Sequence, residues 1–400
     1  MTEENMSKLE ELIEQYCPDG VEYVKIGEIA QVGTGSSNGN EAIEDGIYPF
    51  FVRSQIIKKK DTYEYDEEAI IIPGEGGIGD IFHYINGKYA LHQRVYRIHF
   101  ISPHINVKFA FYYMKSAFKK FIMAKAVSST VSSIRKPMIE GFSLPIPPLP
   151  VQEEIVRILD TFTELQAELQ AELQKRKQQY NYYLDNLLNF KNINRGRCQA
   201  EVRWMKMSEV FEIRNGYTPS KAKKEFWEGG TIPWFRMEDI RQNGRILSDS
   251  ILHITPKGVK GKGLFKANSF ILATTATIGE HALIIADSLA NQRFTNLSIR
   301  KSLKNELSVK YVYYYFFVID EWCKANTNVS NFASVDMSKF YNLLIPIPSI
   351  AEQQRIVSIL DRFDRLTNDL TSGLPAEIEK RRQQYEYYRD KLLTFKRKGA

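Results

Sequence analysis

A glycine-rich segment is the first feature of this sequence that could support chemistry. Residues 73–80 (PGEGGIGD) carry three glycines in the spacing of a dinucleotide-binding loop. Such a loop needs a strand before its first glycine and a helix that opens at its third. Here a proline comes first, and residues 81–89 are aromatic and interrupted by a turn, which favours a strand and hairpin. We therefore expect a tight turn and no nucleotide site.

Other signatures of catalysis are absent from the sequence. It has no Gly-x4-Gly-Lys-Ser/Thr phosphate loop, no His-Glu-x-x-His zinc motif and no Gly-x-Ser-x-Gly nucleophile elbow. Pro147-Pro148 lies in IPPL, which is not the Asp/Asn-Pro-Pro-Tyr/Phe box of DNA amino-methyltransferases. Cys17, Cys198 and Cys323 are far apart and odd in number, which excludes a disulfide scaffold and a cysteine zinc site. We expect no catalytic, metal or cofactor site in this chain.

The composition is that of a globular protein of two or three domains, with 400 residues, 43% hydrophobic residues and a net charge of +6. The longest apolar run, 311–319, is about half of a membrane span. The acidic N-terminal segment does not resemble a signal peptide. Few and scattered cysteines suit a reducing compartment. We therefore expect a cytoplasmic protein with no membrane contact.

An internal duplication is the most informative feature. Residues 144–162 return as 344–363, and 175–191 return as 380–396 with 12 of 17 residues identical. A period near 200 residues is far too long for a solenoid repeat. The duplication predicts four parts: module 1 (1–149, with a short helix 5–16), spacer helix 1 (150–195), module 2 (196–349) and spacer helix 2 (350–400).

Weaker echoes connect the two modules. His92-Gln93-Arg94 aligns with Asn291-Gln292-Arg293, so a catalytic histidine at 92 would serve one module only and a structural role is expected. The offset between the copies grows by 19 residues along the modules, and we place the additional residues near the front of module 2, in 218–240. The tails therefore share one task, whereas the modules differ in content.

The spacers read as long helices. Apolar residues recur every three or four positions over about 40 residues, which predicts one helix of roughly 60 Å that pairs with the other spacer. Gly373 and Pro375 should break or kink the second spacer. The TELQ-AELQ-AELQ run (163–174) is either a stable helix or a spacer whose length matters. Adjacent tyrosines cannot all enter one seam, which leaves tyrosine surface for another protein.

Both modules read as mixed α/β, with strands expected at 69–72, 89–98 and 270–274 and helices at 107–123 and 309–324. Polar loops at 32–40 and 215–221 either contact nucleic acid or are ordinary exposed loops. Module 1 carries 16 basic and 19 acidic residues over 1–150, whereas 196–349 carries 21 and 14. Charge therefore favours a polyanion partner for module 2 in particular.

These residues resemble the specificity subunit of type I restriction-modification systems over nearly the whole chain. Residues 17–29, 202–220 and 232–240 are similar to that family's module openings, and QYNYYLDNLLNF and QYEYYRDKLLTF to the ends of its spacer helices. Module 1 departs after Gly33, where it lacks the Thr-Pro-Ser and Ile-Pro-Trp of module 2.

The resemblance implies an α+β fold, in which two target-recognition domains are separated by two long antiparallel coiled-coil helices in a pseudo-twofold repeat. Each domain would read one half of a bipartite double-stranded DNA target. The helices would set the spacing and dock two methyltransferase (M) subunits and, through the complex, restriction (R) subunits. Catalysis and S-adenosylmethionine would belong to those partners, and the TELQ run would set the length.

The candidate DNA contacts are polar loop residues, basic residues beyond them and the repeated Gln-Arg pair: Thr34, Ser36, Ser37, Asn38, Arg53, Lys58, Gln93 and Arg94 in module 1, and Thr218, Ser220, Lys221, Arg236, Arg241, Gln292 and Arg293 in module 2. The candidate partner contacts are Tyr180, Tyr182, Tyr183, Tyr385, Tyr387 and Tyr388. The Gln-Arg pairs could instead hold each module's fold. Two alternatives for the whole chain stay open: a stand-alone DNA-modifying enzyme and a protein-binding helical adaptor.

Overall fold

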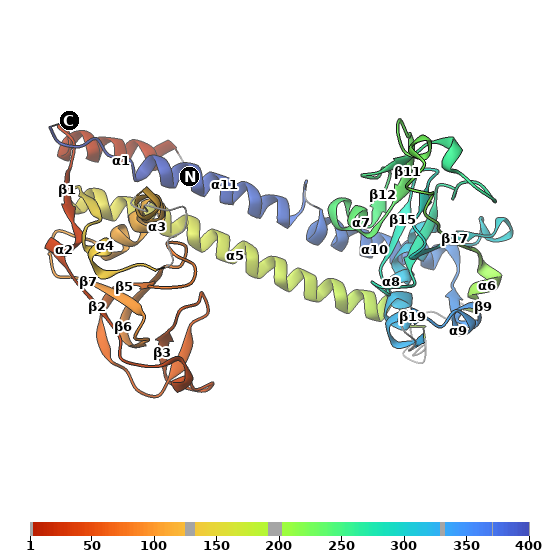
Figure 1. Ribbon diagram of the computed structural model, residues 1–400, viewed down its shortest axis with the longest axis horizontal. Coiled ribbons are helices and arrows are strands. Elements are labelled where there is room, and N and C mark those ends of the chain that lie inside the picture. Colours follow the sequence, from red (N-terminus) through yellow and green to blue (C-terminus); the bar gives the residue numbers. More distant parts are fainter. Residues whose placement is uncertain (1–2, 125–132, 191–201, 329–332, 370, 400) are drawn as a thin grey trace. The chain divides into compact units, whose positions relative to one another are not determined.

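The computed structural model describes residues 3–124, 133–190, 202–328, 333–369 and 371–399. The chain forms two compact units, of which unit 1 comprises 1–171 with 377–400 and unit 2 comprises 172–376 (Figure 1). Each unit thus combines one module with the first part of its own spacer and the last part of the other spacer. Residues 191–201, where spacer helix 1 was expected to end and module 2 to begin, lie outside the described residues.

The two spacers differ in continuity. The first is a single helix, α5 (Leu149–Leu188), and the second consists of α10 (Ile350–Asn368) and α11 (Leu374–Leu392). A Cβ on Gly373 would lie 2.4 Å from the carbonyl oxygen of Arg365, so only glycine fits at the break. The predicted break is confirmed. The predicted length is confirmed as well, since the 40 residues of α5 span about 60 Å.

The same aromatic contact joins the spacers in both units. In unit 1, Phe162 of α5 stacks on Tyr388 of α11, with ring centroids 5.7 Å apart. In unit 2, Phe363 of α10 stacks on Tyr183 of α5 at 5.0 Å. Residue numbers rise along one spacer as they fall along the other, so the helices pair in antiparallel fashion.

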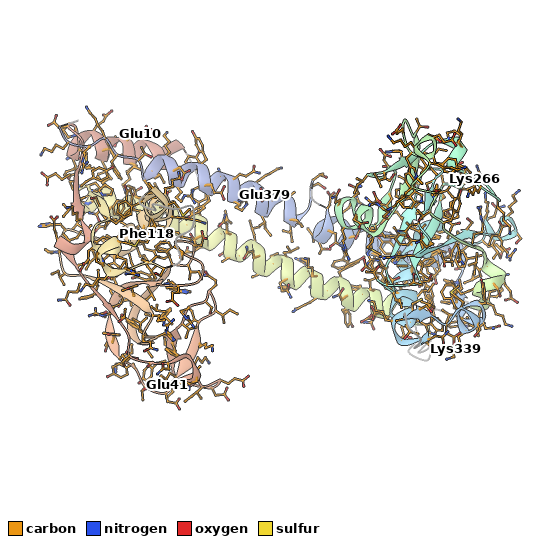
Figure 2. The ribbon with its side chains drawn as sticks, in the orientation of Figure 1. Glu10, Glu41, Phe118, Lys266, Lys339 and Glu379 are labelled. Atoms are coloured by element: carbon orange, nitrogen blue, oxygen red, sulfur yellow. The ribbon has the colours of Figure 1, made fainter. Side chains whose placement is uncertain are left out.

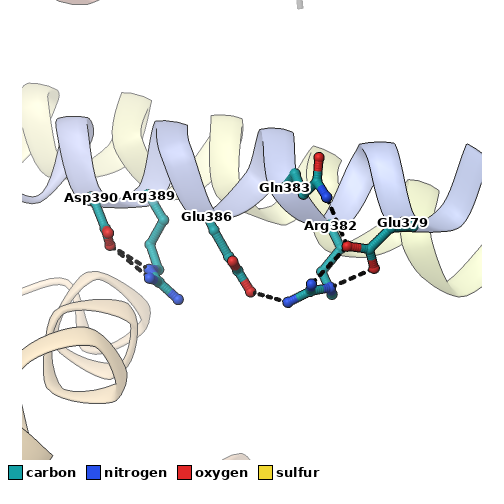
Figure 3. A network of polar contacts seen from close by, with 6 residues as sticks. All are labelled: Glu379, Arg382, Gln383, Glu386, Arg389 and Asp390. Carbon is teal, nitrogen blue, oxygen red and sulfur yellow. Dashed lines mark hydrogen bonds and ion pairs between the residues drawn. The ribbon is translucent and has the colours of Figure 1, made fainter. Parts of the chain in front are cut away.

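The outer face of α11 carries a ladder of charges (Figure 3). The Arg382 guanidinium donates to Glu379, at 2.8 Å, and to Glu386, at 2.7 Å, and Arg389 donates to Asp390 at 2.6 Å. The two Arg382 pairs are three and four residues apart, so their members lie on one helix surface and stabilise it in water. This face matches the solvated side predicted for the spacers.

Unit 1 contains the elements of module 1: α1 (Glu3–Tyr16), β1 (Glu22–Lys25), α2 (Ile26–Ile29), β2 (Ala30–Thr34), β3 (Tyr48–Phe51), β4 (Lys58–Lys60), β5 (Tyr65–Pro73), β6 (His83–Leu91), β7 (Val95–Phe100), α3 (Val107–Ala124), α4 (Lys136–Glu140) and β8 (Ser143–Ile146). Six strands form one sheet in the order β2-β7-β5-β6-β3-β4. Helix α3 buries Met114, Phe118 (labelled in Figure 2) and Ile122 against this sheet through their four-residue spacing.

Unit 2 contains the elements of module 2: β9 (Arg203–Lys206), α6 (Met207–Val210), β10 (Phe211–Asn215), β11 (Ile232–Phe235), α7 (Met237–Asn243), β12 (Ile246–Leu247), β13 (His253–Ile254), β14 (Ser269–Ala273), β15 (His281–Ile284), β16 (Leu289–Ala290), β17 (Phe294–Ile299), α8 (Val309–Ala325), β18 (Thr327–Asn328), β19 (Ser334–Val335), α9 (Met337–Asn342) and β20 (Leu344–Ile347). The strand order is β10-β17-β14-β15-β12 in one sheet and β13-β11-β16 in another. The strands of the six-stranded sheet of module 1 thus correspond to strands of two separate sheets in module 2.

The structure corrects two expectations about the modules. The segment 89–98 is not one strand, because a turn at 92–94 separates β6 from β7. The additional residues of module 2 are not confined to 218–240, because 236–252, with α7 and β12, replace 52–57 of module 1. Module 1 also has a counterpart of the Ile-Pro-Trp segment. Tyr48-Pro49-Phe50 lies in β3, which pairs in parallel with β6 through Phe50 and Phe51, as β11 does with β16.

A buried glutamine fixes the start of each spacer to its module. Gln152 donates to the carbonyl of His104 and accepts from the N–H of Asn106, both at 2.8 Å. Gln353 makes the equivalent bonds to Glu306 and Ser308, also at 2.8 Å. Both glutamine side chains are fully buried. The duplication therefore extends to the hydrogen bonds that join module and helix.

Candidate nucleic-acid interface

The repeated Gln-Arg pair lies on the same turn in both modules. His92 Nδ1 accepts a hydrogen bond from the Arg94 N–H at 3.0 Å, and Asn291 Oδ1 accepts one from the Arg293 N–H at 3.0 Å. Burial lowers the pKa of His92, and the nearby Arg53 and Arg94 lower it further, which keeps the ring neutral and able to accept. Histidine and asparagine thus perform one structural task, as expected for His92.

The polar front loop of each module lies directly on this turn. A Cβ on Gly35 would lie 1.8 Å from the carbonyl oxygen of Leu91, and one on Gly216 would lie 2.2 Å from that of Asn291. Only glycine permits this approach. The loops and turns are then joined by side chains: Gln93 donates to Asn38 at 2.8 Å, and Thr218 donates to Gln292.

In module 2 these residues surround a small cavity of about 230 Å³. Five predicted contact residues are among its lining: Thr218, Lys221, Arg236, Gln292 and Arg293. Lys221, Gln292 and Arg293 are exposed. The backbone N–H of Arg236 donates to Asp239 at 2.6 Å, which fixes the residue at the start of α7. Glu238 also lines the cavity, with its carboxylate 3.8 Å from the Arg236 guanidinium, so the cavity presents cations, a carboxylate, an amide and a hydroxyl together.

In module 1 the corresponding arginines are bonded to a carboxylate. Arg53 and Arg94 each donate to Glu75 Oε2, at 3.0 and 2.9 Å. Both guanidinium groups keep about half of their side-chain surface exposed. Lys58 is exposed on β4, next in sequence to the loop that carries Arg53. The structure thus brings Asn38, Gln93, Arg53 and Arg94 into one region.

The remaining loop residues of module 1 have other environments. Ser37 is buried, and its hydroxyl donates to Glu64 and accepts from Lys60 at 2.7 Å. The hydroxyl is therefore not available at the surface, contrary to the prediction that it contacts DNA. Ser36 is exposed, and its N–H also donates to Glu64. Thr34 is exposed, and its carbonyl accepts from a tyrosine hydroxyl. The Lys60 ammonium also pairs with Glu41, labelled in Figure 2, at 2.6 Å.

Two predicted residues of module 2 lie apart from the cavity lining. Ser220 is exposed, and its carbonyl accepts from the Trp227 indole at 3.1 Å. Arg241 lines a different, larger cavity of about 780 Å³, together with Arg245 of the module and Arg365 of α10. Arg236 immediately precedes α7 and Arg241 lies within it, and the sequence alone did not show that the two side chains line different cavities.

The six tyrosines differ in how far they are exposed. Tyr182 and Tyr387 are 63% and 65% exposed, whereas Tyr180 is buried at 6%. The other three, Tyr183, Tyr385 and Tyr388, contact a phenylalanine of the facing helix. Burial removes Tyr180 from the surface predicted to meet a partner, and the most exposed tyrosine in each copy is the middle one, although Tyr183 also keeps 37% of its surface exposed.

Several residues of these clusters were missed by sequence reasoning: Glu75, Thr277 and Glu64. Glu75 lies in the glycine-rich turn, where module 2 has a neutral threonine at the aligned position, and that difference between the copies was the available signal. Within the described ranges, no group of histidine, cysteine or acidic residues could hold a metal ion. No helix in the described part of the chain is long and apolar enough to cross a membrane.

The comparisons with known proteins identify the family. The family described as "Type I restriction modification DNA specificity domain" matches residues 18–176 and 200–380. This chain belongs to that family. The specificity subunit of the type I restriction enzyme EcoprrI from Escherichia coli is 54% identical over 204 residues, which are 49% of this chain and 51% of that subunit.

A second relative in this family is the EcoR124I/EcoR124II specificity subunit from Escherichia coli. It is 42% identical over 257 residues, 62% of this chain and 60% of the relative. The chain therefore spans about half of the first relative and three fifths of the second. The crystal structure of a type I S subunit from M. genitalium covers 94% of this chain and 96% of its own, with a TM-score of 0.59 at 16% identity. The predicted fold is thereby confirmed.

Proposed function

We propose that this chain is the DNA-recognition subunit of a type I restriction-modification complex, in which each module reads one half of a bipartite duplex target. The observation that carries this proposal is the repeated cluster, built in each module from a front loop, a Gln-Arg turn and a neighbouring arginine. One scaffold with two different sets of exposed polar residues suits the reading of two different half-sites.

The exposed groups have the chemistry of base recognition. Arginine pairs with guanine N7 and O6, and glutamine or asparagine pairs with adenine N6 and N7 in the major groove. Arg293, Gln292 and Lys221 offer such donors in module 2, and Arg94, Gln93 and Asn38 offer them in module 1. Each base-contacting arginine contributes about 1–3 kcal/mol of discrimination at one position.

The spacers would connect this recognition to modification. Two methyltransferase subunits would dock on the paired helices, with Tyr182 and Tyr387 as the accessible aromatic contacts. Restriction subunits would join through that complex. This chain would have no catalytic role and no cofactor, and S-adenosylmethionine would be held by the methyltransferase subunits in the cytoplasm.

Methylome sequencing tests the recognition role. In cells that express this chain with its methyltransferase subunit, we expect methylation at one bipartite motif. The Arg293→Ala and Arg236→Ala variants should then lose discrimination in the half-site read by module 2 and keep the other half-site. Binding that is unchanged on every duplex would remove these two assignments, and methylation without any bipartite motif would refute the function.

Two activity measurements separate this role from the alternatives. The purified chain with S-adenosylmethionine and DNA should transfer no methyl group until the methyltransferase subunit is added. Transfer by the chain alone would favour a stand-alone enzyme. Affinity for DNA should fall steeply as the salt concentration rises, because lysine and arginine side chains that bind phosphates release the counterions of the DNA. The absence of any salt-dependent affinity for DNA would instead support a protein-binding adaptor.

A further inference from the structure

Glu75 is an acidic residue in the midst of the polar cluster of module 1. It lies in the turn between β5 and β6, and its Oε2 atom accepts from both Arg53, at 3.0 Å, and Arg94, at 2.9 Å. The Glu75 side chain keeps 38% of its surface exposed. The two guanidinium groups and the carboxylate therefore form one ion-pair cluster that solvent can reach.

Module 2 has no acidic residue at the equivalent position, and the carboxylate that lines its cavity, Glu238, pairs with Arg236 at 3.8 Å and not with Arg293. The N–H of Gly74 donates to the carbonyl of Arg94 at 2.9 Å, and that of Thr274 donates to the carbonyl of Arg293 at 3.0 Å. Gly74 and Thr274 are also bonded alike on their other side, where their carbonyls accept from Ile134 at 2.7 Å and Val335 at 2.9 Å.

This match of backbone bonds makes Thr275 the counterpart of Glu75. Thr275 is neutral and half-buried. The guanidinium of Arg293 makes no ion pair within the described residues of the chain, and it is exposed. The two modules thus present the same arginine in two electrostatic settings, paired in module 1 and unpaired in module 2.

The difference matters for DNA because phosphates carry charge and base edges do not. An arginine beside Glu75 can approach a neutral acceptor such as guanine N7 or O6 at little electrostatic cost. Approach to a phosphate brings two anions together and weakens the contact. A carboxylate in this position therefore penalises binding that lacks the correct base edge, which is the usual route to specificity by repulsion.

The net charges of the two modules differ in the same sense. Residues 1–150 are net acidic, with 16 basic and 19 acidic side chains, whereas 196–349 are net basic, with 21 and 14. Sequence-independent affinity for DNA comes from cations that neutralise phosphates. Module 2 is therefore the better general DNA binder, and module 1 gains little from the phosphate backbone.

We propose that Glu75 is a specificity-determining residue of module 1. It holds Arg53 and Arg94 away from phosphates and so makes module 1 discriminate against incorrect half-sites, whereas module 2, with Thr275, holds DNA of any sequence more tightly. The inference rests on the proposed function, because it requires that each module contacts one half-site.

The test uses the chain assembled with its methyltransferase subunits and three duplexes: the cognate target, and the same target with one or the other half-site scrambled. Glu75→Gln keeps the shape of the side chain and removes its charge. Glu28→Gln, at an exposed carboxylate on α2, removes one charge from the same module and serves as the matched control. Thr275→Glu introduces the carboxylate into module 2. Dissociation constants are measured by competition at several salt concentrations.

We expect Glu75→Gln to bind the duplex with a scrambled module 1 half-site about tenfold more tightly than the unaltered chain, with a smaller change on the cognate duplex. Discrimination by module 2 should stay the same. The salt dependence on the scrambled duplex should become steeper, because the released arginines contact phosphates. Thr275→Glu should sharpen discrimination by module 2 in the same way.

Three results would overturn the inference. Equal behaviour of Glu75→Gln and Glu28→Gln would show that only net charge matters. A loss of affinity on all three duplexes at an unchanged melting temperature would make Glu75 a support for the arginines. Retained discrimination by module 1 in Glu75→Gln would exclude a selective role. If the unaltered complex does not prefer the cognate duplex at all, the proposed function fails before any variant is compared.

Discussion

At the scale of single residues, aligned positions of the two modules can be compared to separate structural roles from functional ones. The turn that carries Gln93 and Arg94 needs an acceptor for one backbone N–H, and His92 supplies it where Asn291 does in the other module. The ring of His92 therefore acts through one nitrogen atom. This explains why His92, next to the candidate contacts Gln93 and Arg94, is replaced by an asparagine in module 2.

The first prediction follows from that equivalence. His92→Asn should fold and bind the cognate duplex as the unaltered chain does, because asparagine Oδ1 can accept the same bond. His92→Ala should lower the free energy of unfolding by about 1–3 kcal/mol, since the Arg94 N–H then loses its acceptor. Urea denaturation of the full chain measures both. Equal losses in the two variants would show that packing of the ring, and not the bond, matters.

His281 of module 2 is a buried histidine that no sequence pattern singled out. Its Nδ1 lies 2.6 Å from Asp320 Oδ2, and Arg245 contacts the same carboxylate at 3.2 Å. Complete burial lowers the pKa of His281. The neutral ring can donate to Asp320, so the network is satisfied on this side without a charge on the imidazole.

The second prediction concerns the pH dependence of unit 2. An unfolded histidine has a pKa near 6.5. Because the folded pKa of His281 is lower, the unfolded chain binds more protons below that pH, and stability falls as pH decreases. Melting temperatures at pH 7.5 and 5.5 should therefore differ more in the unaltered chain than in His281→Gln. An equal pH response in both would assign the effect to other groups.

At the scale of elements, periodicity was a strong guide and local turns were not. Helix α5 follows from apolar residues at helical spacing, and the break before α11 follows from Gly373 and Pro375. The strand at 89–98 was misread because apolar residues flank the turn on both sides, and the turn is held by a bond from the Val95 N–H to the His92 carbonyl together with a side-chain bond of His92. A bond between a side chain and a nearby backbone group leaves no periodic signal.

The cluster was predictable only in part for the same reason. The repeated Gln-Arg pair and the front loops stood out through the duplication, and the structure places them together. Glu75 did not stand out, because its role depends on two arginines distant in sequence. Ser37 was wrongly expected at the surface, since nothing in the sequence shows that Lys60 and Glu64 enclose its hydroxyl.

The third prediction belongs to the joint between module and helix. Gln353 makes three hydrogen bonds in full burial, to Ser308 N–H and to the carbonyls of Glu306 and Pro348. Gln353→Ala should destabilise unit 2 by about 2–4 kcal/mol, because buried polar groups are left without partners. Gln152→Ala should have a similar effect on unit 1. Gln170→Ala, at an exposed position of α5, is the control, and urea denaturation is the measurement.

At the scale of the whole molecule, each unit contains parts of both spacers. The chain passes between the units twice, once within α5 near Ala171 and once near the start of α11. The TELQ-AELQ-AELQ run, 163–174, spans the first of these crossings. Its residues are mostly exposed, whereas Phe162, just before the run, is buried. The run therefore contributes helix length and little packing.

The fourth prediction follows from that position. Deletion of one AELQ unit, 167–170, should leave α5 a continuous helix, because its residues have high helix propensity. The helix becomes shorter by about 6 Å, which corresponds to about one or two base pairs of DNA. Methylome sequencing should therefore show the same two half-sites with a shorter gap. The equivalent stretch of the second spacer already contains a break, so it can adjust to the loss. A methylated motif with an unchanged gap would show that α5 does not set the spacing, and altered half-sites would show that the deletion disturbs the modules themselves.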